Sequence, residues 1–211
     1  MAPKLKLTYF NIEGAAEKVR LALKLGGIDF QDERIDMASW SALKPSTPYG
    51  QLPLLTIDDQ APVTQSFAML RYVGRLTNLY PADPQEALQV DEACGLQEDF
   101  ARALTPSMYI GMRPHLFGYP EDMPEADRKA IQAKLRAALV AEGGDIPRFL
   151  GYFEAMLAKQ GMIRERNVAP KRFLSCWLYA LCRNRILLWA YRDHCGLHHP
   201  SRASPAQERP S

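Results

Sequence analysis

The first part of the chain begins with two contrasting patterns of apolar residues. Leu5, Leu7 and Tyr9 alternate with polar residues, and this period of two predicts a strand that ends near Phe10. From residue 15 onward the apolar positions recur at helical spacing, until Gly26-Gly27 supplies a typical helix end. The chain is therefore predicted to open with a strand followed by a helix.

The next 50 or so residues extend this unit in the same manner. The remaining predicted segments are a strand over 28–35, a hairpin of 54–57 and 61–64 around Asp58-Asp59-Gln60, and a helix marked by Phe67, Leu70, Val73 and Leu76. The expected order is β-α-β, a loop, then β-β-α. Pro81-Ala-Asp-Pro84 breaks the pattern, which indicates a linker over 81–85.

No strand pattern follows the linker. Residues 86–112, 121–141 and 145–160 are rich in strong helix formers, so an all-helical part is expected there. Thr105-Pro106 should kink or interrupt the first of these helices, and Gly143-Gly144 followed by Asp145 predicts a stop and then an N-cap. The predicted division is 1–80 as an α/β domain, 81–85 as linker, 86–161 as a helical domain, 162–199 as an atypical helical segment and 200–211 as a disordered tail.

Composition narrows the class of protein. A chain of 211 residues that is 47% hydrophobic can bury a full core, and a net charge of +2 gives little support for nucleic-acid binding. No apolar stretch is long enough for a membrane span or a secretory segment, so a cytoplasmic protein is expected. Cys94, Cys176, Cys182 and Cys195 show neither CxxC nor a metal-ligand spacing, which favours reduced thiols and no metal.

Charge is distributed unevenly along the chain. Residues 1–161 hold 17 basic and 21 acidic side chains, whereas residues 162–211 hold 9 basic and 3 acidic ones. Three of the four cysteines also lie in this last quarter. The change near Gly161 indicates that residues 162–211 differ in kind from the rest.

One set of residues carries a more specific signal. It consists of Tyr9-Phe10, Gly14, Trp40, Lys44, Tyr49-Gly-Gln-Leu-Pro53 and Gln65-Ser66. Together they resemble the cytosolic glutathione transferases of the tyrosine type, close to the sigma, pi, mu and alpha classes. The resemblance covers residues 4 to about 160 and implies an α/β thioredoxin-like N-terminal domain, with Pro53 cis, followed by an all-α domain.

The same resemblance implies an activity. It predicts a cytoplasmic homodimeric detoxification enzyme that conjugates glutathione, its co-substrate, to small hydrophobic electrophiles without a cofactor. The thiol of glutathione, with a pKa of about 8.5 like that of free Cys, is mostly protonated at neutral pH, although only the thiolate is a good nucleophile. Tyr9, at the end of a strand and beside a helix start, is the predicted hydroxyl donor to the sulfur.

The other predicted site residues follow from the resemblance. The backbone of Gln51, Leu52 and Pro53 would pair with the cysteinyl residue, and Gln65 and Ser66 would hold the γ-glutamyl carboxylate. Trp40 and Lys44 would bind the glycine carboxylate, and Asp99 would bind the γ-glutamyl amine in the partner's site. Phe10 and Tyr109 would line the electrophile pocket. Taken singly, each has a plainer interpretation. Tyr9 could be an ordinary strand tyrosine, Ser66 a helix cap, Asp99 a solvated charge and Tyr109 a core residue.

Two departures from the family pattern leave alternatives open. Ala15 stands where the family often has Arg, which predicts weaker catalysis, and no Ser/Thr-x-x-Asp box occurs between 145 and 211. Residues 162–211 are therefore predicted not to form the family's C-terminal core. A shifted reading frame or an alternative exon would produce such a change in sequence, and the alternative interpretation is a divergent helix with a flexible tail. The runner-up functions are a glutathione-binding or scaffold protein with little turnover and a sigma-type prostaglandin isomerase. A dithiol oxidoreductase is disfavoured because Tyr9-Phe10-Asn11-Ile12 occupies the place of a CxxC.

Overall fold

A small mixed sheet forms the base of the molecule. The computed structural model describes residues 3–159 of the chain. Strands β1 (Leu5–Phe10), β2 (Phe30–Ile35) and β3 (Leu54–Ile57) lie in the order β2-β1-β3. β1 pairs in parallel with β2 and antiparallel with β3, so β1 is central, and its last two residues, Tyr9 and Phe10, pair with β2 alone.

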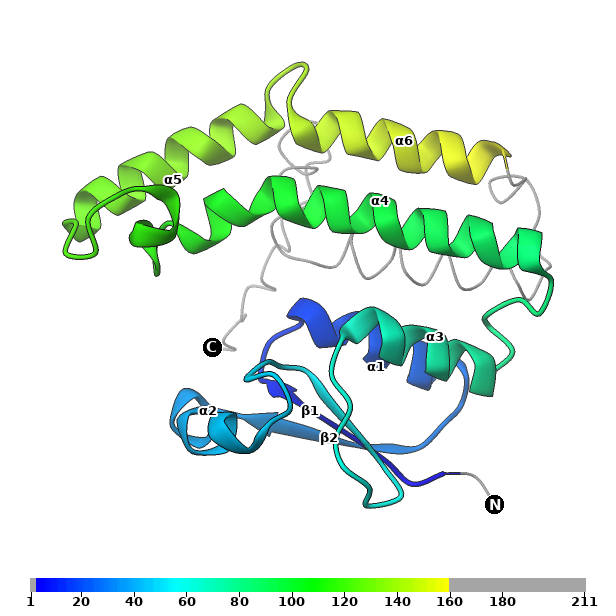
Figure 1. Cartoon of the computed structure of the whole chain (residues 1–211). Helices are drawn as coiled ribbons and strands as arrows, with labels where there is room; N and C mark the ends of the chain where they lie inside the picture. The colour runs from blue at the N-terminus through cyan, green and yellow to red at the C-terminus, as the bar shows by residue number, and fades with distance from the viewer. Residues whose placement is uncertain (1–2, 160–211) are drawn as a thin grey trace, which may run out of the picture.

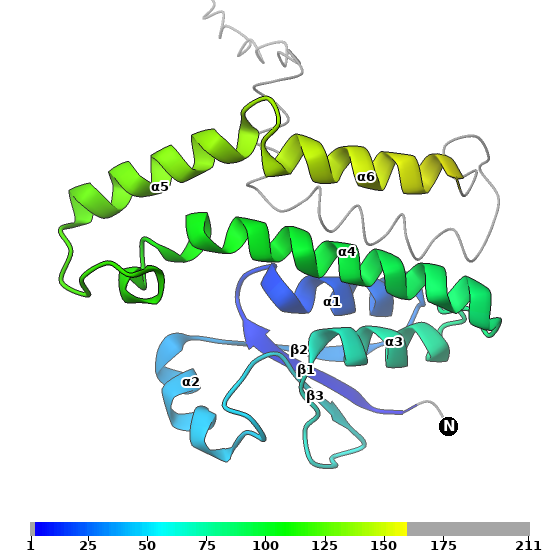
Figure 2. The ribbon, with the colours of Figure 1, turned by 45° about the horizontal axis from the view of Figure 1, so that its top comes forward.

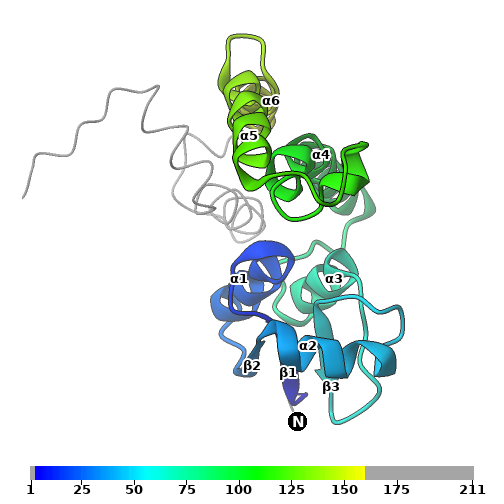
Figure 3. The same ribbon diagram turned by 90° about the vertical axis from the view of Figure 1, so that its left-hand side faces the viewer.

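Two helices cover one face of this sheet. Helix α1 (Glu17–Leu25), which follows the short 3-10 turn η1 (Gly14–Ala16), and α3 (Ser66–Leu76) lie side by side between the sheet and the helices formed by residues 84–159 (Figures 1 and 3). The shared core beneath them consists of Leu5, Leu7, Val19, Leu23, Leu55, Met69, Leu70 and Val73. Because alternate residues of a strand point to one face, Leu5 and Leu7 enter this core together.

The second half of the described chain is helical. Helix α4 (Pro84–Tyr109) runs the length of the molecule, and α5 (Glu125–Val140) and α6 (Asp145–Lys159) pack against it, with the short turn η3 (Pro114–Phe117) between α4 and α5 (Figures 1 and 2). Phe100 of α4 is fully buried, with its ring centroid 5.2 Å from that of Phe149 and 6.1 Å from that of Phe153. Aromatic packing therefore holds α4 to α6.

Charged side chains lie in the seam between the two halves. The Lys18 ammonium of α1 lies 4.4 Å from the centroid of the Phe67 ring of α3. Burial lowers the pKa of Lys18 to about 8, although the nearby acidic groups Cys94 and Glu98 on α4 act to raise it. The seam therefore holds a lysine whose positive charge is poorly solvated.

A second polar contact crosses the seam nearby. Arg71 Nε of α3 donates to Asp91 Oδ1 of α4 at 2.7 Å, and the Tyr80 hydroxyl donates to Asp91 Oδ2 at 3.0 Å. Asp91 thus joins the last helix of the sheet domain to the first long helix of the next.

The predicted fold class, an α/β thioredoxin-like unit followed by an all-α part, is confirmed. The strands over 5–10, 28–35 and 54–57 are present within a residue or two, and Leu52-Pro53 is cis as the resemblance implied. The prediction of a second hairpin strand over 61–64 is wrong. Within that range only Val63 pairs, through one bridge to Leu55. Pro62 has no N–H to give to a ladder, which explains the short pairing.

Other local expectations also need correction. Helix α4 begins at Pro84, with Asp83 as its N-cap, so the last two residues of the predicted linker belong to the helix. Pro106 does not interrupt α4, because the Ile110 N–H still donates to the Pro106 carbonyl (3.0 Å) and carries the helix through to its end. Asp145 is the first residue of α6 instead of the cap before it. The predictions for residues 162–199 and 200–211, with Cys176, Cys182 and Cys195, lie outside the described residues.

Candidate active site

The hydroxyl of Tyr9 meets the start of the first helix. Tyr9 is the penultimate residue of β1, and its oxygen accepts a hydrogen bond from the Ala15 N–H at 3.2 Å. Burial raises the pKa of Tyr9 above its usual 10.0, and the Ala15 bond opposes this only in part. The phenol therefore stays protonated at neutral pH, and its own proton is available to a further acceptor.

Gly14 makes this approach possible. Its φ is +45°, and a Cβ at this position would stand 2.7 Å from the Tyr9 oxygen. Any other residue would strain the backbone and push the phenol away. Both the backbone conformation and the lack of space therefore require glycine at position 14.

A row of aromatic rings extends from Tyr9. The Phe10 ring centroid lies 5.6 Å from that of Tyr9 and 6.3 Å from that of Trp40, both in edge-on geometry. Trp40 comes from α2 (Met37–Leu43), a helix that the sequence pattern missed, and the exposed Lys44 begins the 3-10 turn η2 (Lys44–Ser46) directly after it. Three of the predicted site residues therefore form one connected group with Lys44 close by in the chain.

The segment before β3 offers a free stretch of backbone. Leu52 is half-buried and precedes the cis bond to Pro53, which leads directly into β3. Within residues 3–159, Leu52 shares no backbone hydrogen bond with another turn or loop. Its N–H and C=O are thus placed where an extended peptide could pair with them.

Gln65 and Ser66 open helix α3, but in roles that differ from the simple cap. Gln65 is the N-cap residue, with φ +74° and ψ +96°, and its side chain makes no capping bond. Instead Gln65 Nε2 donates to Gln51 Oε1 at 3.3 Å, so two predicted residues contact each other. Ser66 is the first helical residue, so the alternative that it caps the helix is wrong. A non-glycine residue in this backbone region is uncommon and is often found at functional sites.

The two predicted residues of α4 differ in their surroundings. Asp99 is exposed and pairs with Arg102 of the same helix at 3.2 Å, instead of with a residue of the sheet domain. Tyr109, the last residue of α4, is 37% exposed and lies close enough to Tyr9 that its ionisation would raise the pKa of Tyr9. The structure therefore brings Tyr109, and not Asp99, to Tyr9 within this chain.

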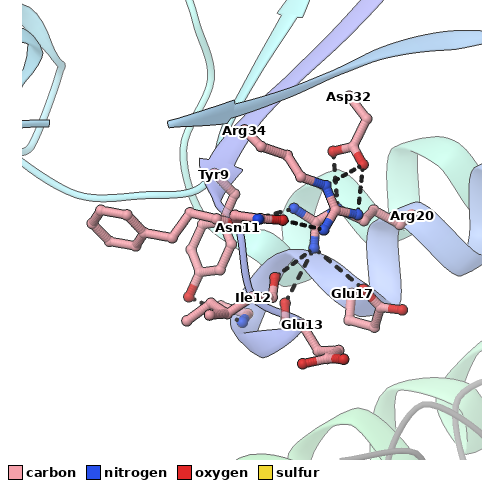
Figure 4. Close-up of polar contacts among 10 residues, drawn as sticks. Tyr9, Asn11, Ile12, Glu13, Glu17, Arg20, Asp32 and Arg34 are labelled. Atoms are coloured by element: carbon pink, nitrogen blue, oxygen red, sulfur yellow. Dashed lines mark hydrogen bonds and ion pairs between the residues drawn. The ribbon is translucent and has the colours of Figure 1, made fainter. Parts of the chain in front are cut away.

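Sequence reasoning missed the residue that holds the loop around this site. Arg20 of α1 is buried, and its guanidinium donates to the Ile12 carbonyl (2.8 Å), to Glu17 (3.2 Å) and to Asp32 of β2 (3.0 Å), as Figure 4 shows. Weaker contacts reach the carbonyls of Phe10 and Glu13, both at 3.4 Å. The loop that joins Tyr9 to α1 is thus tied to a single cation.

Asp32 connects this cation to a second one. Its other carboxylate oxygen accepts from Arg34 Nε at 3.0 Å, and Arg34 also donates to the Asn11 side chain at 2.9 Å (Figure 4). Partial burial acts to raise the pKa of Asp32, but the hydrogen bonds and charges of Arg20 and Arg34 outweigh it, so its pKa lies below the usual 3.8. In the sequence this network is visible only as the three charged residues Glu17, Arg20 and Asp32. Nothing in their spacing distinguishes them from charges on a solvated surface.

Other features of the described chain lie apart from this site. A hollow of about 800 Å³ is lined by Lys4, Leu5, Lys6, Asp29, Phe30, Gln31, Thr56 and Asp59, none of them predicted to bind glutathione. Residues 3–159 contain no group of three or more potential metal ligands. Among the helices of this part, none is both long and apolar enough to cross a membrane.

Comparisons with known proteins identify the family of the chain. A family model described as the N-terminal domain of glutathione S-transferase matches residues 15–76. Glutathione S-transferase 1 of Ascaris suum is 36% identical over 159 residues, which are 75% of this chain and 69% of that protein. Hematopoietic prostaglandin D synthase of Gallus gallus is 37% identical over 98 residues, which are 46% of this chain but only 49% of that protein, so the chain spans about half of this relative.

A solved structure supports the fold independently. The prostaglandin synthase D of Nilaparvata lugens superposes with a TM-score of 0.63 at 24% identity, and the match covers 92% of this chain and 94% of that one. At this level of identity the likeness concerns the fold.

Proposed function

The chain belongs to the glutathione S-transferase family, and from this premise we propose that it activates glutathione as a thiolate through Tyr9 and conjugates it to hydrophobic electrophiles. The observation that carries the proposal is the Tyr9 hydroxyl itself. Burial keeps this hydroxyl neutral, and the Ala15 N–H donates a hydrogen bond to its oxygen. The hydroxyl itself donates no hydrogen bond within residues 3–159, so its proton is available to a bound ligand. A bound sulfur would be that ligand.

One hydrogen bond has the strength that the activation needs. Lowering the pKa of the thiol by about two units requires about 2.7 kcal/mol, and a hydrogen bond to a charged acceptor contributes roughly 1.5–3 kcal/mol. The N–H groups at the start of the first helix add a smaller favourable field. The thiolate then attacks the electrophilic carbon and forms the carbon–sulfur bond, and with chlorodinitrobenzene the carbon–chlorine bond breaks and chloride leaves with the bonding electrons.

The tripeptide would be held at the edge of the sheet formed by the carboxyl ends of β1 and β2 and the amino end of β3. The free backbone of Leu52, before Pro53, would pair with the cysteinyl residue as an added strand. The uncapped N–H groups at the start of α3, with Gln65 and Ser66, suit the γ-glutamyl carboxylate, and Gln51 braces Gln65. The strained backbone of Gln65 is consistent with a binding role.

The two ends of glutathione would meet charged and aromatic groups. Trp40 through its indole N–H and Lys44 through its charge would receive the glycine carboxylate. Asp99 would bind the γ-glutamyl amine of the partner subunit's site in a homodimer, because within this chain it faces solvent and Arg102. Sedimentation at assay concentrations tests the dimer.

The electrophile would lie against aromatic side chains. Phe10 of β1 packs edge-on against Tyr9, and Tyr109, at the end of α4, would supply a second aromatic side chain. Both are apolar enough to accept a hydrophobic substrate. The activity would be a cytoplasmic detoxification reaction that uses glutathione as co-substrate and no cofactor.

Substitution of Tyr9 by Phe tests the proposal. Tyr9→Phe removes one hydroxyl, so the fold and retention on glutathione resin should persist while the pKa of bound thiol rises by about two units. The measurement is thiolate absorbance against pH in the bound complex, with turnover of a chlorodinitrobenzene substrate. Tyr152→Phe, on the half-exposed face of α6, is the matched control and should change neither. An unshifted titration in Tyr9→Phe would exclude Tyr9 as the donor.

A second candidate function has its own support. The Gallus gallus relative is a prostaglandin D synthase, which favours an isomerase that uses the same thiolate. Assay of prostaglandin H isomerisation beside conjugation separates the two activities. Retention on glutathione resin with neither activity would indicate the binding protein.

A further inference from the structure

The last turn of α4 is irregular. Pro106 has no N–H, so the carbonyl one turn before it lacks the usual helical donor. The Ser107 hydroxyl, which is buried, turns back to donate to the Leu104 carbonyl at 2.9 Å. Beyond Tyr109 the helix ends, and the chain enters a turn in which the Arg113 N–H donates to the Tyr109 carbonyl at 2.8 Å.

Helix α5 supplies the hydrogen bonds that this turn lacks. Gln132 Nε2 donates to the Ser107 carbonyl at 2.8 Å, and Arg128 Nη1 donates to the Gly111 carbonyl at 3.2 Å. A helix end leaves its last carbonyls without intrahelical partners, and here Gln132 satisfies one of them, that of Ser107, while Arg128 binds a carbonyl of the turn just beyond the helix. The Gln132 amide also lies over Gly111, since a Cβ there would be 3.5 Å from Nε2.

The carbonyl that Gln132 binds lies two residues before Tyr109. Tyr109 is the last residue of α4, and the end of α4 lies on the same side of the molecule as the carboxyl end of β1, where a negative charge on Tyr109 would raise the pKa of Tyr9 (Figures 1 and 2). A shift of this last turn would therefore move Tyr109 relative to Tyr9. Glutathione activation is less exposed to such a shift, because the bond between Ala15 and Tyr9 lies wholly within the first domain.

We propose that Gln132 is a positioning residue for the electrophile: its bond to the Ser107 carbonyl fixes the last turn of α4 and so sets the place of Tyr109 beside the site. The inference rests on the proposed function, since it assigns Tyr109 to the electrophile pocket. It separates two tasks between the domains. The first domain binds and activates glutathione, and the contact between α5 and α4 shapes the place for the second substrate.

The test compares donors and non-donors at position 132. Gln132→Met keeps the length of the side chain and removes the N–H, whereas Gln132→Lys returns a donor. Lys134→Met, an exposed residue of the same helix, is the matched control. For each protein the measurements are KM for glutathione and for chlorodinitrobenzene, the pKa of bound thiol, and the affinities for S-hexylglutathione and glutathione.

We expect Gln132→Met to raise KM for the electrophile and to weaken S-hexylglutathione by about 3- to 10-fold, the factor that one hydrogen bond supplies. KM for glutathione and the thiol pKa should stay unchanged, Gln132→Lys should recover most of the loss, and Lys134→Met should match the wild type. The proposal is wrong if Gln132→Met lowers the melting temperature but leaves the ratio of the two affinities unchanged. It is equally wrong if glutathione and S-hexylglutathione weaken together.

The ratio of the affinities for S-hexylglutathione and glutathione also distinguishes a failure of the Gln132 proposal from a failure of the proposed function. It needs no turnover, because the hexyl chain occupies the electrophile pocket in a binding measurement. A wild-type protein that binds S-hexylglutathione more tightly than glutathione but does not conjugate would contradict the proposed function and leave the test of Gln132 intact. A ratio of one in the wild type would overturn the role of Gln132, because there would then be no pocket for it to shape.

Discussion

Gly14 shows how closely the site depends on a missing side chain. Its positive φ requires glycine, and so does the Tyr9 oxygen, which would stand only 2.7 Å from a Cβ at this position. Gly27 has a similar φ of +66°, but a Cβ there would meet nothing within 4 Å. The two glycines therefore separate the cost of backbone strain from the cost of crowding the phenol.

Gly14→Ala should lose activity out of proportion to its loss of stability. Backbone strain should cost both Gly14→Ala and Gly27→Ala roughly 1–2 kcal/mol of unfolding free energy, the usual penalty for alanine in the left-handed region, and crowding of the phenol should add to the cost of Gly14→Ala. Only Gly14→Ala should also displace Tyr9 and raise the pKa of bound thiol. Urea unfolding and thiolate titration give the two quantities.

A double variant checks the cause. In Tyr9→Phe the oxygen that crowds the new methyl group is gone, so Gly14→Ala should cost less stability there than in the wild type. The ring carbons Cε1 and Cζ of residue 9, 3.0 and 3.3 Å from the same Cβ position, remain in Tyr9→Phe, so only part of the crowding should be relieved. Equal costs in both backgrounds would show that the hydroxyl oxygen is not the limiting contact.

Among the strands and helices, the ones that could be predicted from their apolar period are those with a buried face. β1, α1 and α3 each present regular apolar positions to one core, so their period is visible in the sequence. Helix α2 has no buried residue and was missed, although it carries Trp40. Arg20 was missed for a different reason: most of its partners are carbonyls of a loop, and main-chain acceptors leave no trace in the sequence.

The ion pair between α1 and β2 predicts an acid sensitivity. The pKa of Asp32 is lower in the folded protein than the unfolded value of 3.8, so its contribution to stability is complete above that pH and is lost as the pH falls through the folded pKa. Asp32→Asn should therefore reduce the unfolding free energy by about 1–3 kcal/mol at neutral pH, and the difference should vanish in acid.

Urea unfolding of the two proteins across this pH range makes the measurement. Asp59→Asn is the control, because its ion pair with Lys4 at 3.4 Å is largely exposed and should contribute little. A gap between wild type and Asp32→Asn that persists unchanged in strong acid would contradict the electrostatic explanation.

A poorly solvated positive charge at the junction of the two domains lowers the stability of the fold. Lys18 lies between α1, α3 and α4, and burial disfavours its charged form. Its folded pKa of about 8 is below the unfolded value of 10.5, so the unfolded chain binds more protons between these values. Stability from this group should therefore rise as the pH increases from about 8 to 10.5.

Lys18→Met should stabilise the protein at neutral pH, on the order of 1–2 kcal/mol. The advantage should shrink as the pH rises through this window, where the wild-type lysine loses its proton. Lys24→Met is the control, since Lys24 also lies over a ring, at 5.3 Å from the centroid of Phe30, but is exposed. A constant advantage at all pH values would show that packing, and not charge, is responsible.

Strand β2 lies at one margin of the sheet in the described part of the chain, with β1 on only one side of it. Its outer row of N–H and C=O groups could accept a strand from another molecule, which is the usual route to aggregation. Asp32, Glu33 and Arg34 stand in succession on this strand, and three adjacent charges oppose such pairing. Two of them are the residues that brace the loop beside Tyr9. Neutralising this run would therefore endanger the solubility of the protein as well as its chemistry.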